Sequence, residues 1–180
     1  MEFLELVKKR RSIRAYSDKS LKREDILKCL EAARLAPSAC NAQPWKFVIV
    51  VDKDLISKIA KKTLHSIYSF NRFIENAGAL ICVVSEKEGL KRYVGKRIMG
   101  TDYYLIDIGI ACEHLVLQAT ELGIGSCWIG WFDERRLKDI LNVPEKKRVA
   151  VIIALGYTKK PSTTCSSRKK LERIISFNEY

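Results

Sequence analysis

Three arginines and one serine lie within five positions near the start of this 180-residue chain. If residues 10–14 are extended, Arg10, Ser12 and Arg14 project to one side, because side chains alternate along an extended chain. Guanidinium groups bind phosphate through paired hydrogen bonds, so this arrangement suits a single anion. Spacing alone favours a basic surface turn over an anion site, and both interpretations stay open.

A second polar segment lies further along, between a helical pattern and a strand-like run. Pro37 and Pro44 each fix their own φ and keep the preceding residue out of the helical region, so an extended strap is predicted. A rigid polar connection between buried elements suits a binding site, and a capped helix end followed by a turn fits equally well. Three residues between the prolines can donate and accept hydrogen bonds: Ser38, Asn41 and Gln43.

Neither a metal site nor a phosphate loop is indicated. His65 and His114 have no ligand-like spacing around them, which argues against zinc. The chain contains neither Gly-x-x-x-x-Gly-Lys nor Gly-x-Gly-x-x-Gly, so a dinucleotide-binding fold of that kind is unsupported. No cysteines pair as Cys-x-x-Cys and three lie in apolar segments, which predicts buried free thiols in a reducing compartment. The cysteines are Cys29, Cys40, Cys82, Cys112, Cys127 and Cys165.

The net charge of +12 raises the question of an anionic partner. Basic proteins bind nucleic acids, membranes or phosphorylated ligands. The sequence has no helix-turn-helix, zinc-finger or RNP-like motif, and no apolar run approaches the roughly 18 residues that span a bilayer. It opens without a signal peptide. We therefore expect a cytoplasmic protein that binds neither nucleic acid nor membrane, with most of its charge on a solvated surface.

The length and the hydrophobic pattern predict one domain over residues 1–180, with mixed α and β structure and a sheet of about four strands. The strand-like run 46–51 is apolar on both faces, which predicts a central position in the sheet. Residues 86–101 have weak periodicity and several glycines, typical of a mobile loop or a short irregular helix over a site. The predicted helices are 3–10, 23–35, 55–64, 104–122 and 134–141; the predicted strands are 46–51, 79–84, 125–130 and 149–155.

The longest helical pattern, 104–122, is apolar on two faces. A helix of this kind is buried on most sides, in a core or in a subunit interface. Asp107, Glu113 and His114 within it argue against a membrane span. Gly123 is placed to end the helix, and Asp133 is placed to cap the next one.

Taken together, these segments resemble the FMN-dependent nitroreductase family, the NAD(P)H:FMN oxidoreductase-like proteins. Each segment is weak by itself, whereas their order and spacing are specific and extend over nearly the whole chain. The segments that carry the resemblance are 10–14, 37–45, 123–130, 155–157 and 167–172.

The resemblance implies an α+β homodimer with a nitroreductase-like fold, whose central sheet of four to five strands is mostly antiparallel. Two FMN sites would lie at the subunit interface, and helix 104–122 would form much of that interface. It implies that Arg10 and Arg168 hold the FMN phosphate, and that Arg14 lies at the pyrimidine side of the flavin ring. The other implied cofactor contacts are Arg11, Ser12, Pro37, Ser38, Ala39 and Asn41, the last four reaching the partner's FMN, and the backbone of Trp128, Ile129 and Gly130 near the reactive N5.

The family's asparagine and lysine contacts to the ring from its middle segment have no plain counterpart, and Asn71 and Asn76 are the candidates to replace them. By resemblance the chain is an enzyme that uses FMN and NAD(P)H, without a metal, to reduce nitroaromatics, quinones or related small electrophiles by a ping-pong mechanism. The flavin N5 performs the chemistry, so no catalytic side chain is needed, and Arg14 serves as electrostatic stabiliser. Two alternatives stay open: a flavin-fragmenting or dehalogenating enzyme of the same fold, and a basic anion- or nucleic-acid-binding protein without enzymatic activity.

Overall fold

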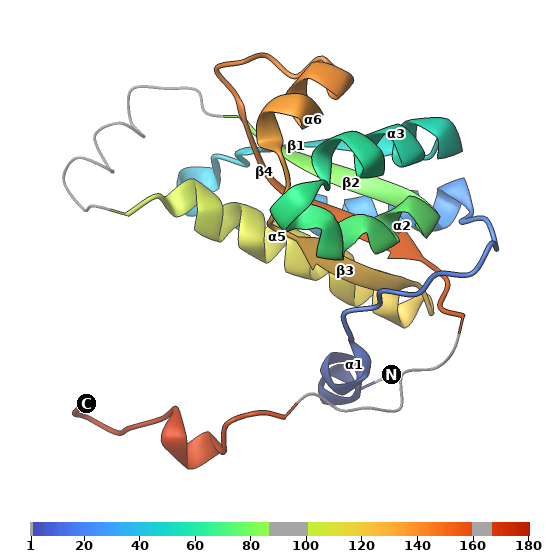
Figure 1. Cartoon of the computed structure of the whole chain (residues 1–180). Coiled ribbons are helices and arrows are strands. Elements are labelled where there is room, and N and C mark those ends of the chain that lie inside the picture. The colour runs from blue at the N-terminus through green and yellow to red at the C-terminus, as the bar shows by residue number, and fades with distance from the viewer. Residues whose placement is uncertain (1, 87–100, 160–166) are drawn as a thin grey trace.

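A four-stranded sheet organises the fold in the computed structural model, which describes residues 2–86, 101–159 and 167–180 (Figure 1). Its strand order is β1-β2-β4-β3, and every neighbouring pair is antiparallel. The α+β prediction with an antiparallel sheet is confirmed. The strands are β1 (Trp45–Val50), β2 (Ala79–Ser85), β3 (Gly125–Ile129) and β4 (Arg148–Gly156).

The predicted central position of the first strand is wrong, because β1 is an edge strand. Along β1 the side chains alternate only loosely between covered and open positions, and Ile49 is 42% exposed. The central strands are β2 and β4, and every residue of β2 is buried. A run of β-branched and aromatic residues indicates a strand that packs well, whereas its place in the sheet depends on which strands pair with it.

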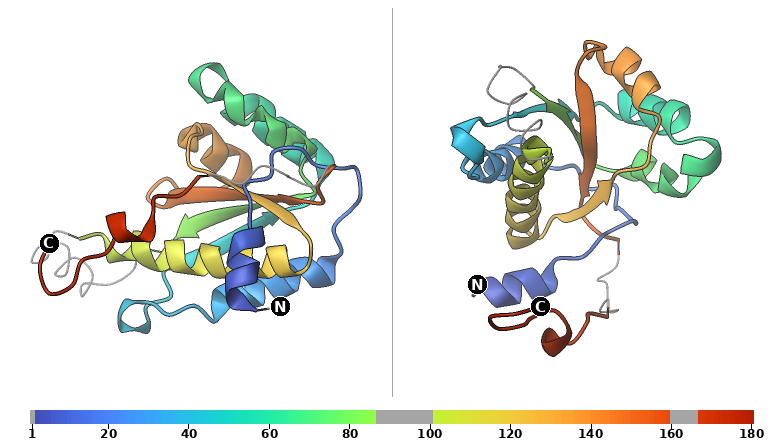
Figure 2. Two further views of the ribbon diagram at one scale, coloured as in Figure 1. Left: turned by 90° about the horizontal axis from the view of Figure 1, so that it is seen from below. Right: turned by 90° about the vertical axis from the view of Figure 1, so that its left-hand side faces the viewer.

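Helices cover both faces of the sheet, which gives three layers (Figure 2). On one face α2 and α5 pack on residues such as Ile81 and Val83 of β2. On the other face α3, η2 and α6 pack on Leu80 and Cys82, so successive residues of β2 serve opposite layers. The helices are α1 (Phe3–Lys9), α2 (Arg23–Arg34), α3 (Lys53–Thr63), α5 (Tyr103–Glu121) and α6 (Glu134–Leu141), and the 3₁₀ segments are η1 (Ala39–Asn41), η2 (Ser66–Asn76) and η3 (Leu171–Arg173).

Helix α5 has the two apolar faces predicted for it. One face is buried against the sheet and α2, whereas Tyr103, Leu105 and Ile106 at its start are exposed. Gly123 follows the helix with φ of +72°, a conformation that only glycine adopts readily, as the sequence predicts. No helix among the described residues combines the length and the apolar character needed to cross a bilayer.

Several other sequence predictions have clear outcomes. Asp133 caps α6, because its side chain accepts a hydrogen bond from the Arg136 backbone N–H at 3.1 Å. Cys29, Cys82, Cys112 and Cys127 are buried free thiols as predicted, whereas Cys40 is exposed. The segment predicted to be a mobile loop or an irregular helix, 86–101, lies almost wholly outside the described residues, as does Cys165.

Candidate functional site

The N-terminal arginine segment is tied to the open edge of β3. Ser12 forms a parallel bridge with Ser126, and the Ile13 backbone N–H donates to the Ser126 carbonyl oxygen at 2.8 Å. A Cβ on Gly125 would lie only 2.8 Å from the Ile13 side chain, so this close approach requires glycine. Contacts between parts of the chain more than a hundred residues apart therefore fix where the arginines lie.

Further along the same segment, Tyr16 is fully buried between the sheet and η2. Its hydroxyl donates to the Ala154 carbonyl oxygen at 3.3 Å, and its backbone pairs with Thr158. Burial raises the pKa of Tyr16 well above its usual value, so it serves as a neutral anchor. Anchors at Ser12 and at Tyr16 hold Arg14 from both sides.

Arg14 lines an open pocket of about 310 Å³. The parallel register that pairs Ser12 with Ser126 brings Arg14 alongside Trp128, two residues further along both segments. A Cβ added to Gly130 would meet nothing within 4 Å, so the space above this backbone is open. The pocket is lined by Arg14, Phe70, Asn71, Trp128, Gly130 and Trp131.

Of the two candidate asparagines, Asn71 lies in this pocket and Asn76 is exposed at the end of η2. Asn71 is buried, and its Nδ2 donates to the Trp131 carbonyl oxygen at 2.9 Å. This bond joins η2 to the connection that follows β3.

Phe70 and Trp131 are pocket residues that sequence reasoning missed. Their ring centroids are 6.2 Å apart, and each side chain is 63% exposed. Two large exposed aromatic rings at the mouth of a pocket offer a surface on which a planar molecule can pack. In the eleven-residue 3₁₀ segment η2 the apolar residues Ile67, Phe70, Phe73 and Ile74 recur at helical spacings, and this pattern was the available signal.

Arg10 lies at the other end of the arginine segment, against α5. Its side chain is 20% exposed, and its Nε lies 3.9 Å from Glu113 Oε1. Burial raises the pKa of Glu113, and the positive charge of Arg10 only partly opposes this. Burial likewise raises the pKa of Cys127, opposed by the charges of Arg14 and Arg10, so both guanidinium groups act on the same edge strand.

Arg11 and Arg168 lie in other surroundings. Arg11 turns back toward the end of α1, where its guanidinium donates to the carbonyl oxygens of Lys8 and Arg10. Arg168 lies in the C-terminal tail, all of whose described residues from 167 to 180 are exposed, and it donates to the Ser167 carbonyl oxygen at 3.1 Å. Helix α1 and this tail lie beyond α5, away from the sheet (Figure 2).

The strap 36–45 is only partly extended, which corrects the sequence prediction. Ser38 has extended backbone, but the next residues form the 3₁₀ turn η1, and Cys40, Asn41 and Gln43 have φ of 52°, 51° and 44°. Each proline restricts only itself and the residue before it, so the residues between remain free to turn. The turn is held by hydrogen bonds from Gln43, whose N–H donates to Ser38 Oγ at 2.9 Å and whose Nε2 donates to Asn41 Oδ1 at 3.1 Å.

Within one chain the strap does not join the arginine pocket. The Ala39 backbone N–H contacts Asp107 on α5, whereas Arg10 contacts Glu113 on the same helix. Six residues along an α-helix correspond to about 9 Å. The pocket thus brings together Arg14, Trp128 and Gly130, whereas the predicted site residues Pro37, Ser38, Ala39 and Asn41 lie elsewhere on the chain.

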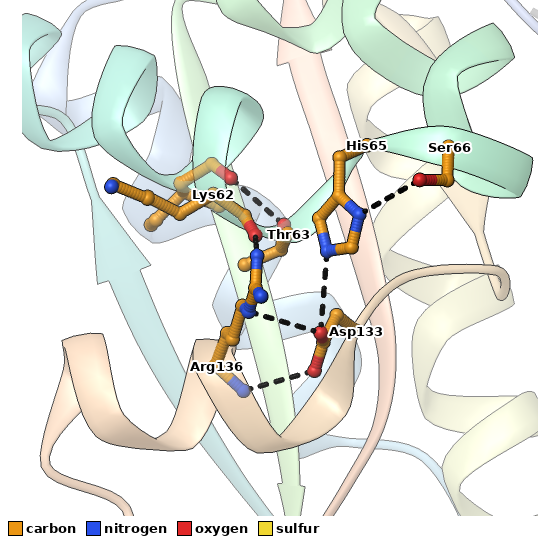
Figure 3. A network of polar contacts seen from close by, with 7 residues as sticks. Lys62, Thr63, His65, Ser66, Asp133 and Arg136 are labelled. Carbon is orange, nitrogen blue, oxygen red and sulfur yellow. Dashed lines mark hydrogen bonds and ion pairs between the residues drawn. The ribbon is translucent and has the colours of Figure 1, made fainter.

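A polar network joins the end of α3 to the start of α6 (Figure 3). His65, just after α3, has its Nε2 3.4 Å from Asp133 Oδ2, and the Asp133 backbone N–H donates to the Thr63 carbonyl oxygen at 2.9 Å. Arg136 reaches the Lys62 carbonyl oxygen at 3.4 Å. These contacts hold the start of η2 against the connection that carries Trp131. No cluster suited to a metal ion occurs among the residues that the structure describes.

Replacing Asp133 with alanine should lower the free energy of unfolding by about 1 kcal/mol at pH 7, the usual cost of losing a helix cap. The α6 backbone, His65 and Arg136 lower the pKa of Asp133, so its ionised form stabilises the fold at neutral pH. This contribution is present above the unfolded pKa of about 4 and disappears as pH falls through the lower folded pKa.

Urea unfolding from pH 7 to pH 3 measures this difference, which should shrink below about pH 4. Asp133→Asn is the matched control, because asparagine still caps a helix but does not titrate in this range. A wild-type advantage over the alanine variant that stays constant down to pH 3 would contradict the assignment.

The family model described as "Nitroreductase family" matches residues 7–157. The chain belongs to the nitroreductase family. It is therefore an oxidoreductase, as the resemblance in its sequence segments implied.

Three relatives of this nitroreductase family member illustrate the range of the match. The chain is 38% identical over 162 residues to an Archaeoglobus fulgidus protein that carries an NADH dehydrogenase/NAD(P)H nitroreductase name, covering 88% of this chain and 86% of that protein. It is 27% identical to an iodotyrosine deiodinase of Thermotoga neapolitana, covering 96% and 97%. The structure of an FMN-dependent nitroreductase from Clostridium difficile R20291 superposes with a TM-score of 0.80 at 29% identity, covering 99% and 100%.

Proposed function

We propose that this protein is an FMN-dependent oxidoreductase that takes electrons from NAD(P)H and reduces nitroaromatics, quinones or related small electrophiles. The observation that carries the proposal is the pocket in which Arg14, Asn71 and Trp128 surround the open backbone at Gly130. A cation, an amide and aromatic side chains around an uncovered glycine suit a flat, heteroatom-rich ring. The FMN-dependent relative of the same fold supports this ligand.

The residues present fit FMN in composition. Gly130 has open space where any side chain would project, and Asn71 has its Nδ2 engaged by Trp131, so its Oδ1 is the atom that can serve a ligand. Arg10 lies against α5 and Ser12 pairs with Ser126, and with Arg168 they would hold the phosphate. When bound, FMN supplies the hydride acceptor and donor of the reaction.

The chain's own residues orient the cofactor and adjust its electrostatics. Arg14 provides a fixed positive charge beside the pocket, which favours negative charge on the pyrimidine side of the ring. Trp128 and Ile129 at the end of the edge strand β3, and Gly130 after it, would offer their backbone to the ring. Arg11 donates to the Arg10 carbonyl oxygen and so supports the arginine segment. Because the pocket is open on one side, donor and acceptor would occupy it in turn, which corresponds to ping-pong kinetics.

A homodimer would complete this site. Exposed apolar side chains gather on α1, on the start of α5 and in the C-terminal tail, as expected of an interface. In the dimer the strap residues Pro37, Ser38, Ala39 and Asn41 would reach the partner's FMN, which explains why they lie apart from the pocket of their own chain. Representative exposed residues are Phe3, Leu4, Leu105, Ile106, Leu171, Ile174 and Phe177.

The test is the identity of the chromophore and its link to assembly. The purified protein should release FMN rather than FAD on heating. As the protein is diluted, light scattering should show the dimer dissociating, and the absorbance of bound flavin should fall over the same range of concentration. Recovery of FAD, a flavin-loaded monomer, or a protein that stays colourless after reconstitution would contradict the proposal; the colourless result would favour an anion-binding protein without enzymatic activity.

Reductive dehalogenation is a second candidate, supported by the similarity to the Thermotoga neapolitana deiodinase over 96% of the chain. Steady-state kinetics with a nitroaromatic, a quinone and a halotyrosine separate the two. We expect parallel double-reciprocal lines with the first two acceptors and little halide release. Halide release that is faster than nitro or quinone reduction would favour the second candidate.

A further inference from the structure

Asp107 is a carboxylate buried within helix α5. Its side chain is only 5% exposed, yet its neighbours along the helix, such as Tyr104, Ile108 and Ala111, are packed in an apolar core. A buried carboxylate is unfavourable unless hydrogen bonds compensate it. The compensating contact is the backbone N–H of Ala39, which donates to Asp107 Oδ1 at 3.0 Å.

The segment that Asp107 holds has an unusual backbone. Cys40, Asn41 and Gln43 all have φ between 44° and 52°, which residues with a side chain rarely adopt. Such conformations persist where the surroundings hold them, and they concentrate at ligand-binding segments. The hydrogen bonds from Gln43 to Ser38 and Asn41 are internal to the strap, whereas the bond from Ala39 to Asp107 attaches this turn to the rest of the protein.

The turn of α5 that contains Asp107 also carries exposed apolar side chains. Leu105 and Ile106 are 39% and 51% exposed, whereas Asp107, one position further, is directed to the strap. Adjacent residues of a helix point about 100° apart, so a single turn serves both surfaces. A partner subunit that packs on Leu105 and Ile106 would therefore also fix the position of Asp107.

We propose that Asp107 is a positioning residue: it ties the strap to helix α5 and holds residues 37–41 in the conformation that binds the partner subunit's flavin. The flavin part rests on the proposed function, whereas the tie itself is independent of any ligand. Asp107 thereby links assembly of the dimer to completion of the site.

Three variants of the full chain test this inference. Asp107→Leu removes the acceptor, and Asp107→Asn keeps an oxygen that accepts from Ala39. Leu115→Ala makes a cavity at a fully buried position of α5, eight residues or about 12 Å along the helix from Asp107. Hydrogen–deuterium exchange of residues 36–45 in the flavin-free protein measures the tie. FMN affinity, from quenching of flavin fluorescence, measures its consequence.

We expect faster exchange of the Ala39 amide and about tenfold or greater loss of FMN affinity in Asp107→Leu. Asp107→Asn should resemble wild type in both, and Leu115→Ala should lower thermal stability with neither change. Unchanged exchange in Asp107→Leu would overturn the tie. If Asp107→Leu exchanges faster but binds FMN as tightly as Leu115→Ala does, the positioning role is overturned. If the wild-type protein binds no FMN, the proposed function is overturned, and the exchange result alone decides whether Asp107 holds the strap.

Discussion

Arg14→Gln should lower the two-electron reduction potential of the bound flavin by roughly 30–65 mV and slow its reduction by NAD(P)H. Arg14 lines the pocket and provides positive charge there. The proposed function places the pyrimidine side of the flavin beside this charge, and that side of the ring becomes negative on reduction. A hydrogen bond to a charged group contributes about 1.5–3 kcal/mol, and for two electrons 1.4 kcal/mol corresponds to about 30 mV.

Equilibration with reference dyes measures this potential, and stopped-flow absorbance measures the rate of reduction. Arg72→Gln is a suitable control, because Arg72 is an exposed arginine on η2 whose ion pair with Glu75 has an N–O distance of 3.8 Å. The control should leave the potential unchanged. A potential in Arg14→Gln within a few millivolts of wild type would remove Arg14 from its assigned role.

The second large effect is expected on cofactor affinity. Arg10→Gln should weaken FMN binding about 10- to 150-fold, the equivalent of 1.5–3 kcal/mol, and leave the potential of the remaining bound flavin nearly unchanged. The reason is that the proposed function assigns Arg10 to the phosphate of FMN rather than to its redox-active ring. Arg168→Gln should act in the same direction, because the sequence resemblance assigns it to the same group.

Riboflavin, which lacks the phosphate, provides the internal control for both variants. Its affinity should not change on replacing Arg10 or Arg168, whereas that of FMN should fall. In Arg10→Gln the Glu113 carboxylate, whose Oε1 lies 3.9 Å from Arg10 Nε in the wild type, loses its cationic partner and could repel the phosphate. The double variant Arg10→Gln/Glu113→Gln removes this carboxylate, so it separates the lost attraction of Arg10 for the phosphate from the added repulsion by Glu113. Equal losses for riboflavin and FMN would show that Arg10 supports the fold of the segment rather than the phosphate.

The individual helices and strands could be predicted from the sequence, because their ends and their buried faces depend on residues that are close together in the chain. Asp133 caps α6 and Gly123 ends α5 as predicted, because a cap depends on one side chain and a left-handed turn on one missing side chain. The buried strands β2 and β4 were recognisable because apolar side chains on both faces need cover on both faces.

The candidate site could be predicted only in part, because some of its residues are positioned by contacts with distant segments. Alternation along an extended segment predicted one side for Arg10, Ser12 and Arg14, whereas Arg10 contacts Glu113 of α5 and Arg14 lines the pocket beside η2. Phe70 and Asn71 lie on a helical segment that an apolar pattern could have indicated, but the pocket that they line forms only where η2 meets Trp128, Gly130 and Trp131. The left-handed turn at Cys40 could not be predicted from its neighbours either, because it depends on the hydrogen bond that the Ala39 backbone N–H donates to Asp107 Oδ1, 68 residues along the chain.

The sequence alone therefore determined the type and approximate bounds of the main helices and strands, together with the family resemblance, because these depend on side chains close together in the chain. Only the tertiary structure decided that β1 is an edge strand, that Arg14 meets Trp128 and Asn71 in one pocket, and that the strap lies against α5 instead. Each of those depends on pairing between distant segments, such as Ser12 with Ser126, and no local pattern specifies which distant partner a segment meets.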